Sequence, residues 1–205
     1  MAQAKRSTAQ ARGEARKKAL IDAVIRLLAR EGAAGVTHRA VAIEAGAKHG
    51  SARYYFSTRS ALLREALNTI VLDQANEITA LVEAHGGAND ATLVTSLSAH
   101  VCHRITHHRD SELARYELFL AAARSGDYQA TLNAWARSYI ALFKRSAAAT
   151  GMHLSDADGW RMLNLLNGLI LQQLATPIDD FETAVLVPTL MDYFDLIRSQ
   201  SAGRA

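Results

Sequence analysis

The sequence of 205 residues contains a single cysteine, Cys102, so no disulfide can form within the chain. A lone cysteine is typical of a reducing compartment, and we expect a cytoplasmic protein. No apolar run approaches the ~20 residues that cross a bilayer, and the basic first residues lack the apolar core of a signal peptide. The sequence therefore predicts no membrane partner.

Proline and aromatic residues are also scarce: the chain has two prolines, and 6% of its residues are aromatic. No segment shows sustained two-residue alternation, whereas apolar residues recur at spacings of three and four. Hydrophobic residues make up 49% of the chain, which is ample for a buried core. These features predict an all-α protein of about nine helices.

Motifs of several enzyme classes are missing as well. The chain has no Gly-rich phosphate loop, no nucleophile elbow and no Glu-x-x-His pair of the kind that di-iron bundles use. His100, His103 and His107 form a stripe at spacings that suit a metal site, but no carboxylate or cysteine at matching spacing completes it. We therefore expect no catalysis, no metal and no cofactor.

Acidic residues are few in the first part of the chain. Residues 1–59 contain 12 Lys and Arg against 4 Asp and Glu, a formal charge of +8. Residues 60–205 contain 11 against 16, a charge of −5, which gives +3 for the whole chain. A basic first third indicates a polyanionic partner at that end only, and a solvated basic face without a partner is the alternative.

Helical periodicity and turn residues predict where the elements begin and end. Residues 1–13 are polar and basic and are predicted to be a mobile arm, which either reaches into the minor groove of DNA or is inert. A loop is predicted at 85–90, and Pro188 predicts a kink or break in the last helix. The predicted helices span about 14–30, 38–45, 48–54, 59–84, 91–107, 111–124, 128–149, 156–175 and 180–199.

The most informative stretch runs from Thr37 to Leu63 and reads T-H-R-A-V-A-I-E-A-G-A-K-H-G-S-A-R-Y-Y-F-S-T-R-S-A-L-L. It predicts two short helices joined by a turn at Gly46, with Thr37 as the N-cap of the first. This pattern is typical of a helix-turn-helix, in which one helix enters the major groove of DNA. The second helix carries side chains that donate hydrogen bonds to phosphates or base edges: Lys48, His49, Ser51, Arg53 and Tyr54.

Residues 14–65 or so, which include this stretch, resemble the TetR family of transcriptional regulators. Lys48 stands where the family usually has a cap, Arg53 where many members have Tyr, and His49 where many have Lys. The operator sequence therefore cannot be transferred. The resemblance rests on Glu31-Gly32 at the end of the first helix, Thr37 as a cap, Ala45-Gly46 as a turn, His49-Gly50-Ser51 with Tyr55-Phe56 in the recognition helix, and Thr58-Arg59 before Leu62-Leu63.

The resemblance implies a DNA-binding domain at residues 1–58 and a helical ligand-binding and dimerisation domain at residues 59–205. It also implies that a homodimer binds a near-palindromic, double-stranded DNA operator, with Thr37, Tyr55 and Arg59 on phosphates. Lys48, Arg53 and His49 are the candidates for base edges, and Arg39 suits either role. The complete predicted DNA interface is Thr37, Arg39, Lys48, His49, Gly50, Ser51, Arg53, Tyr54, Tyr55 and Arg59.

In the family, a small molecule bound in the second domain alters DNA binding, so the resemblance implies a repressor with a small apolar or amphipathic effector. An effector-independent or partner-controlled regulator is the alternative, and ordinary packing or exposure is the alternative for each residue below. The predicted pocket residues are polar or aromatic: His100, His103, Tyr116, Phe119, Trp135, Asn164 and Asn167. The predicted dimer contact comes from the last two helices: Leu169, Gln173, Phe181, Val185, Met191 and Phe194.

Overall fold

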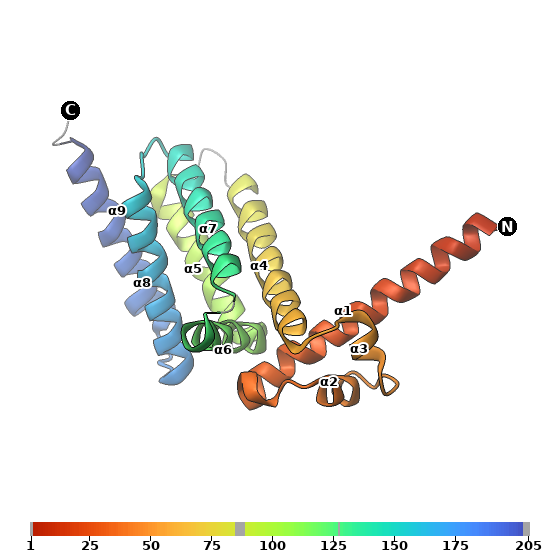
Figure 1. Ribbon diagram of the computed structural model, residues 1–205. Helices are drawn as coiled ribbons and strands as arrows, with labels where there is room; N and C mark the ends of the chain where they lie inside the picture. The colour runs from red at the N-terminus through yellow and green to blue at the C-terminus, as the bar shows by residue number, and fades with distance from the viewer. Residues whose placement is uncertain (1, 85–88, 127, 203–205) are drawn as a thin grey trace. The chain divides into compact units, whose positions relative to one another are not determined.

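The computed structural model describes residues 2–84, 89–126 and 128–202, and the described chain is helical apart from short connections (Figure 1). The predicted all-α fold is therefore confirmed. Most of the loop predicted at 85–90 lies outside the described residues. The elements are α1 (Ala2–Gly35), α2 (His38–Glu44), α3 (Ser51–Tyr55), α4 (Arg59–Ala84), α5 (Asp90–His107), α6 (Arg109–Ser125), α7 (Gln129–Ala149), α8 (Asp156–Ala175), the π-helical segment η1 (Phe181–Leu186) and α9 (Val187–Ala202).

The chain forms two compact units. The first combines the residues up to Ile70 with Asp110–Thr131, and the second combines Val71–Arg109 with the residues from Leu132 onward. Helix α4 therefore begins in the first unit and ends in the second, and nearly all of α6 belongs to the first. The predicted boundary at residues 58 and 59 would instead put α4 and α6 in the second domain. Among the described helices, none combines the length and the apolar character that a bilayer crossing requires.

The core of the first unit comes from the apolar stripes of its long helices. α1 buries Leu20, Val24 and Leu28 completely, at the four-residue spacing that keeps side chains on one face of a helix. Leu62 of α4 and Leu118 of α6 are also fully buried. Each such leucine stabilises the fold by roughly 1.5–3 kcal/mol relative to an exposed side chain.

The first turns of α1 correct one prediction. The helix begins at Ala2, so the mobile arm predicted for this part of the chain is wrong. Ala, Gln, Lys and Arg dominate residues 2–12, and all four have high intrinsic helix propensity. These residues continue a helix whose later turns are fixed by packing from Leu20 onward, so they do not have to nucleate a helix of their own.

Near its end α1 breaks at Gly32, whose φ of 68° and ψ of −179° are essentially restricted to glycine. Polar contacts within the first unit hold the turn that follows. The Ala33 amide donates to the Glu117 carboxylate of α6 at 3.3 Å. Arg59, at the start of α4, donates from Nε to the Val36 carbonyl at 2.9 Å and from Nη2 to the Ala33 carbonyl. The segment that leads into α2 is thereby fixed by both α4 and α6.

In the second unit α5 packs against α8, η1 and α9. Leu93 of α5 and Leu186 of η1 are buried in this core. Helix α8 starts with a capping box, in which the Ser155 hydroxyl accepts from the Asp158 amide while the Asp158 carboxylate accepts from the Ser155 amide. The break predicted near Pro188 takes the form of η1. Because proline cannot donate a backbone hydrogen bond, the regular α-helical pattern gives way in the turn before it.

Helix α8 approaches α7 closely at Gly159, where a methyl group would lie 2.6 Å from Cγ2 of Ile140. We predict that Gly159→Ala lowers the free energy of unfolding by about 1–3 kcal/mol because the added methyl overpacks this contact. In an Ile140→Ala background the same substitution should cost much less, because the clashing side chain is gone. Urea denaturation of the four proteins in this cycle measures the coupling, and additive effects would contradict the close approach of the two helices.

Candidate nucleic-acid interface

Helices α2 and α3 and the turn between them, residues 38–55, are held together by packing and hydrogen bonds, and this segment is called the α2–α3 frame below. The Thr37 hydroxyl accepts a hydrogen bond from a first-turn amide at 3.1 Å, which confirms this residue as the N-cap of α2. Val41 of α2 and Ala52 of α3 are completely buried. The His38 ring nitrogen Nε2 lies 2.8 Å from the carbonyl oxygen of Phe56, so the first residue of α2 contacts the C-cap residue of α3. These contacts fix the orientation of α3.

The recognition helix begins later than the sequence pattern predicts. α3 starts at Ser51 rather than Lys48, and no side-chain hydrogen bond caps it. Gly50 precedes it with a φ of 91°, a left-handed conformation that favours glycine and cannot continue a right-handed helix. Lys48 and His49 therefore lie in the turn between α2 and α3.

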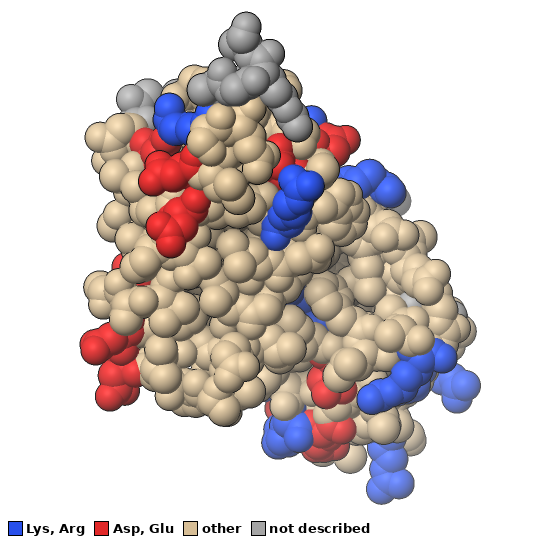
Figure 2. Space-filling view, turned by 90° about the vertical axis from the view of Figure 1, so that its left-hand side faces the viewer, with Lys and Arg blue, Asp and Glu red and all other residues tan. Residues whose placement is uncertain are grey.

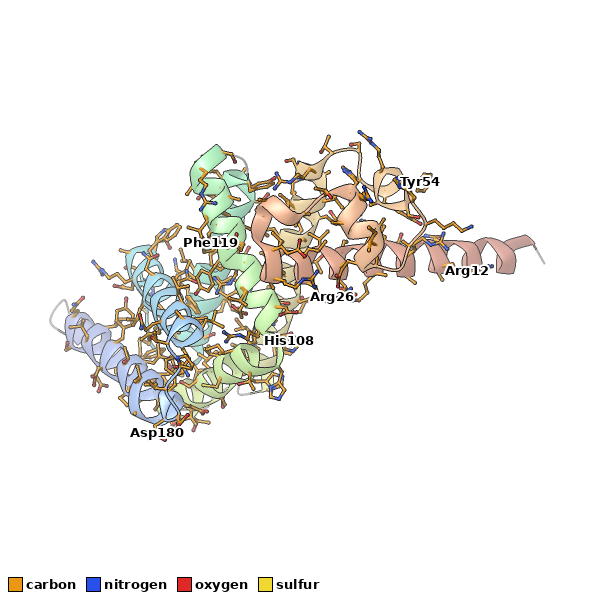
Figure 3. The ribbon with its side chains drawn as sticks, turned by 90° about the horizontal axis from the view of Figure 1, so that it is seen from below. Arg12, Arg26, Tyr54, His108, Phe119 and Asp180 are labelled. Atoms are coloured by element: carbon orange, nitrogen blue, oxygen red, sulfur yellow. The ribbon has the colours of Figure 1, made fainter. Side chains whose placement is uncertain are left out.

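The outer side of this frame is basic and polar. Arg39 of α2, Lys48 and His49 of the turn, and Arg53 of α3 are all exposed. Tyr54 of α3 is exposed over 84% of its surface and lies at the outer edge of the first unit (Figure 3). An aromatic ring left so open to water, among cations, is suited to contact with a partner.

The remaining residues of the predicted interface have contacts inside the chain. Tyr55 is half-buried, and its ring meets that of Tyr54 edge to face at 5.1 Å between centroids. Ser51 is also half-buried. Arg59 donates from Nε and Nη2 to the two carbonyls of the turn after α1.

An ion-pair network that the sequence pattern did not reveal ties α2 to α1. Arg26 Nε and Arg30 Nη2 lie 2.7 and 3.0 Å from the two carboxylate oxygens of Glu44. Hydrogen bonds from the two guanidinium groups lower the pKa of the Glu44 carboxyl, and the bond from Arg26 has the larger effect. The arginines precede Glu44 by 18 and 14 residues, so no spacing rule for a single helix connects them.

The histidine stripe of α5 divides between the surface and the interior of the second unit. His103 and His107 are exposed, and their rings stack with centroids 4.3 Å apart. His100 Nε2 lies 3.6 Å from Oε2 of Glu77 on α4, and Arg104 Nη1 lies 2.7 Å from the same oxygen. In the described ranges no three His, Cys, Asp or Glu side chains gather as metal ligands would.

Trp135 of α7 belongs to a buried aromatic cluster in the second unit, which comprises Gln74, Trp135, Tyr139 and Phe143. The Trp135 and Tyr139 rings lie 4.9 Å apart, and the Tyr139 and Phe143 rings 6.1 Å apart. The Tyr139 hydroxyl donates to Oε1 of Gln74 at 2.6 Å, and both side chains are buried. The sequence did not single out this pair, because 65 residues separate its members.

The other predicted pocket residues lie elsewhere. Tyr116 and Phe119 belong to α6 in the first unit, where the Arg115 guanidinium lies 4.4 and 5.5 Å from their ring centroids. Asn164 of α8 is exposed and Asn167 is half-buried. Of the predicted set, Trp135 is the residue that joins the aromatic cluster.

The residues predicted for a dimer contact differ in exposure. Phe181 and Phe194 are buried within the chain, each with 5% of its surface exposed. The half-buried ones are Leu169, Gln173, Val185 and Met191. Gln173 uses its side-chain amide on the backbone of Ile178. The large apolar residues that α8, α9 and the segment between them expose are Trp160, Leu171, Ile178 and Leu196.

A basic turn and a short exposed helix on a buried frame, joined to a second helical unit, define a helix-turn-helix DNA-binding regulator. Comparison with protein families agrees. Residues 20–66 match the model of the bacterial regulatory proteins of the tetR family, and residues 89–195 match that of the tetracyclin repressor-like C-terminal domain. The second match alone covers more than half of the chain. The protein belongs to the TetR family of transcriptional regulators.

Solved relatives are similar over most of the chain. A TetR-family protein from Streptomyces coelicolor A3 is 28% identical, with 87% of this chain and 97% of that chain covered and a TM-score of 0.67. The multidrug binding protein EbrR, solved with ethidium, is 29% identical at the same coverage, with a TM-score of 0.64. The curated HTH-type transcriptional regulator BetI of Agrobacterium fabrum is 31% identical over 84 residues, which span 40% of this chain and 41% of BetI.

Arg53 is the side chain of α3 best placed to read a base edge, because it is exposed and arginine binds guanine with two hydrogen bonds. We predict that Arg53→Ala reduces the discrimination between operator and single-base variants by about 1–3 kcal/mol. Competition binding measures this difference, and Lys48→Ala in the preceding turn is tested in the same way. Arg124→Ala, which removes an exposed arginine of α6, should change nothing.

Uniform weakening of Arg53→Ala on all duplexes, with a shallower salt dependence, would assign Arg53 to a phosphate instead.

Proposed function

We propose that the protein is a homodimeric repressor that binds a near-palindromic operator and leaves it when a small apolar or amphipathic effector binds. Membership of the TetR family supports DNA binding and regulation. The observation that favours effector control is the buried aromatic cluster, which includes Gln74 of the helix that the two units share. An effector-independent or partner-controlled regulator is the alternative.

The surface of α8 and α9 supports the dimer. Figure 2 looks onto the side where these helices lie and shows a broad area without Lys, Arg, Asp or Glu. Trp160, Leu171 and Leu196 are exposed over 42, 48 and 51% of their surfaces. Uncharged apolar surface of this kind is typical of subunit contacts, and a second copy would supply the second α3 that a palindrome requires.

We predict that Leu171→Asp converts the protein to a monomer at micromolar concentration, because the dimer contact would bury an unpaired carboxylate. Leu72→Asp is the matched control: Leu72 is 61% exposed, and it lies on α4 rather than on the proposed contact. Sedimentation velocity reads out the mass of each variant. A wild-type monomer, or equal masses for the two variants, would contradict the proposed contact.

The relatives and the aromatic cluster together suggest the chemistry of the effector. EbrR has been solved with ethidium, with proflavin and with malachite green, all aromatic molecules. In this chain the rings of Trp135, Tyr139 and Phe143 offer aromatic contacts. The polar atoms of Gln74 and Tyr139 already bond each other, so we expect binding to rest mainly on aromatic and apolar contact.

Helix α4 offers a route from this cluster to DNA. Gln74 lies on the same helix as Arg59, whose guanidinium holds the turn before α2. A ligand that displaces the Gln74 turn therefore acts on a helix that begins in the DNA-binding unit. Release requires the ligand to favour the DNA-incompetent arrangement, by about 1–3 kcal/mol for a modest switch.

Malachite green is a suitable probe, because the planar dyes intercalate into the duplex itself. In a Trp160→Phe background Trp135 is the sole tryptophan. We predict that malachite green quenches Trp135 fluorescence and weakens operator binding by about 5- to 150-fold. Gln74→Leu should change both responses, because it removes the amide that Tyr139 contacts, whereas Asn76→Leu on the exposed side of α4 should change neither.

Operator affinity that resists malachite green and a panel of apolar aromatic compounds would favour the effector-independent alternative. Quenching without any effect on DNA binding would show a ligand site that is not coupled to the operator.

A further inference from the structure

Residues 10–19 of α1 contribute no buried side chain to the core. Among the side chains of α1 that the structure describes, Leu20 is the first buried one, and Gln10 to Ala19 are exposed or half-buried. A helix gains most of its stability from packing, so turns that bury little add little to the fold. The helix nevertheless continues back to Ala2. This part of α1, residues 2–19, is called the basic extension below.

The charge of the basic extension is strongly one-sided. It contains 6 Lys and Arg and a single acidic residue, Glu14. Lys17 pairs with Glu65 at 2.5 Å and Lys18 with Asp22 at 3.0 Å. Arg12 and Arg16 are exposed and lie one turn apart on the same helix face.

Lys5 and Arg6 add two further positive charges to the sequence of the basic extension. The first turn of α1 holds no acidic residue. Cations near a helix N-terminus oppose the helix dipole, so the extension carries an electrostatic penalty when it stands alone in water. A polyanion beside the basic extension would attract these cations and so offset the electrostatic penalty.

The basic extension passes beside the recognition helix. A methyl group at Gly13 would lie 3.8 Å from the Tyr55 hydroxyl of α3. From Gly13 the helix continues for 11 residues, or roughly 17 Å, to Ala2. Figure 1 shows α1 running on past α2 and α3, and Figure 3 labels Arg12 on this part of the helix together with Tyr54 of α3.

We propose that the basic extension of α1 is a second DNA contact, in which Arg12 and Arg16 bind phosphates of the duplex that α3 reads. This inference rests on the proposed DNA-binding role of α3. Duplex DNA carries about one negative charge per 1.7 Å of its axis, so a helix that projects beside a bound α3 meets a dense line of phosphates. The contact is to the sugar–phosphate backbone and adds affinity without adding sequence preference.

The test measures the salt dependence of binding for the full-length protein, its Arg12→Gln/Arg16→Gln variant and a control. Dissociation constants are measured between about 50 and about 200 mM salt, for an operator obtained by selection from random duplexes and for a scrambled duplex of the same composition. The control, Arg137→Gln/Arg145→Gln, removes the same charge from exposed positions of α7. Circular dichroism and thermal melting verify that every variant is folded.

We expect the Arg12/Arg16 variant to bind both duplexes more weakly and by the same factor. The slope of log K against log salt should fall by about 0.9 for each phosphate that the variant no longer neutralises. Arg12→Lys/Arg16→Lys should retain most of the wild-type slope, because lysine keeps the positive charge that neutralises a phosphate. The control should match the wild type.

An Arg12/Arg16 variant with the wild-type slope would overturn the inference, and so would a weakening confined to the operator or shared by the control. Failure of the proposed function is a distinct result, because the wild-type protein itself would then show no preference for any duplex.

Discussion

The five residues of α3 cannot hold a helix by themselves, and everything proposed for the DNA-binding face depends on the packing that holds them. Ala52 turns completely inward, and Phe56 ends the helix with its ring buried and its carbonyl against His38. Because the inward side is fixed, Arg53 and Tyr54 are fixed on the outward side. The exposed cations are therefore positioned by buried apolar contacts rather than by one another.

A second level of contacts positions this frame on the longer helices. Glu44 joins α2 to two arginines of α1, and Arg59 and Glu117 hold the turn after Gly32 from α4 and α6. In each of these contacts a charged side chain bonds to a backbone group or to an opposite charge. The strength of each bond therefore changes when the helices shift by much less than the length of one helical turn. Through α4 and α6 the frame is tied to helices that the sequence would assign to a separate regulatory domain.

The sequence predicted the parts of the molecule that depend on local rules. The boundaries of α4 and α8, the N-cap Thr37 and the exposed Arg53 of α3 follow from periodicity and capping. It failed where the outcome depends on a distant partner or on competing preferences. The members of the Gln74–Tyr139 pair are 65 residues apart in the sequence. The residues that start α1 are polar and basic, which is typical of a mobile arm, but they also have high helix propensity, and they extend a helix that is already packed. The burial of Phe181 and Phe194 likewise depends on how η1 and α9 pack against α5, which no local pattern states.

Selection from a library of random duplexes tests the central claim most directly. It asks whether two copies of the α2–α3 frame, one from each chain of a dimer, bind a specific DNA sequence. The protein is expected to enrich a near-palindromic site whose half-sites lie about one helical turn, 34–36 Å, or a multiple of it apart, with two chains on each duplex. Recovery of an unenriched library at low salt would contradict it, and so would a single unrepeated half-site bound by one chain.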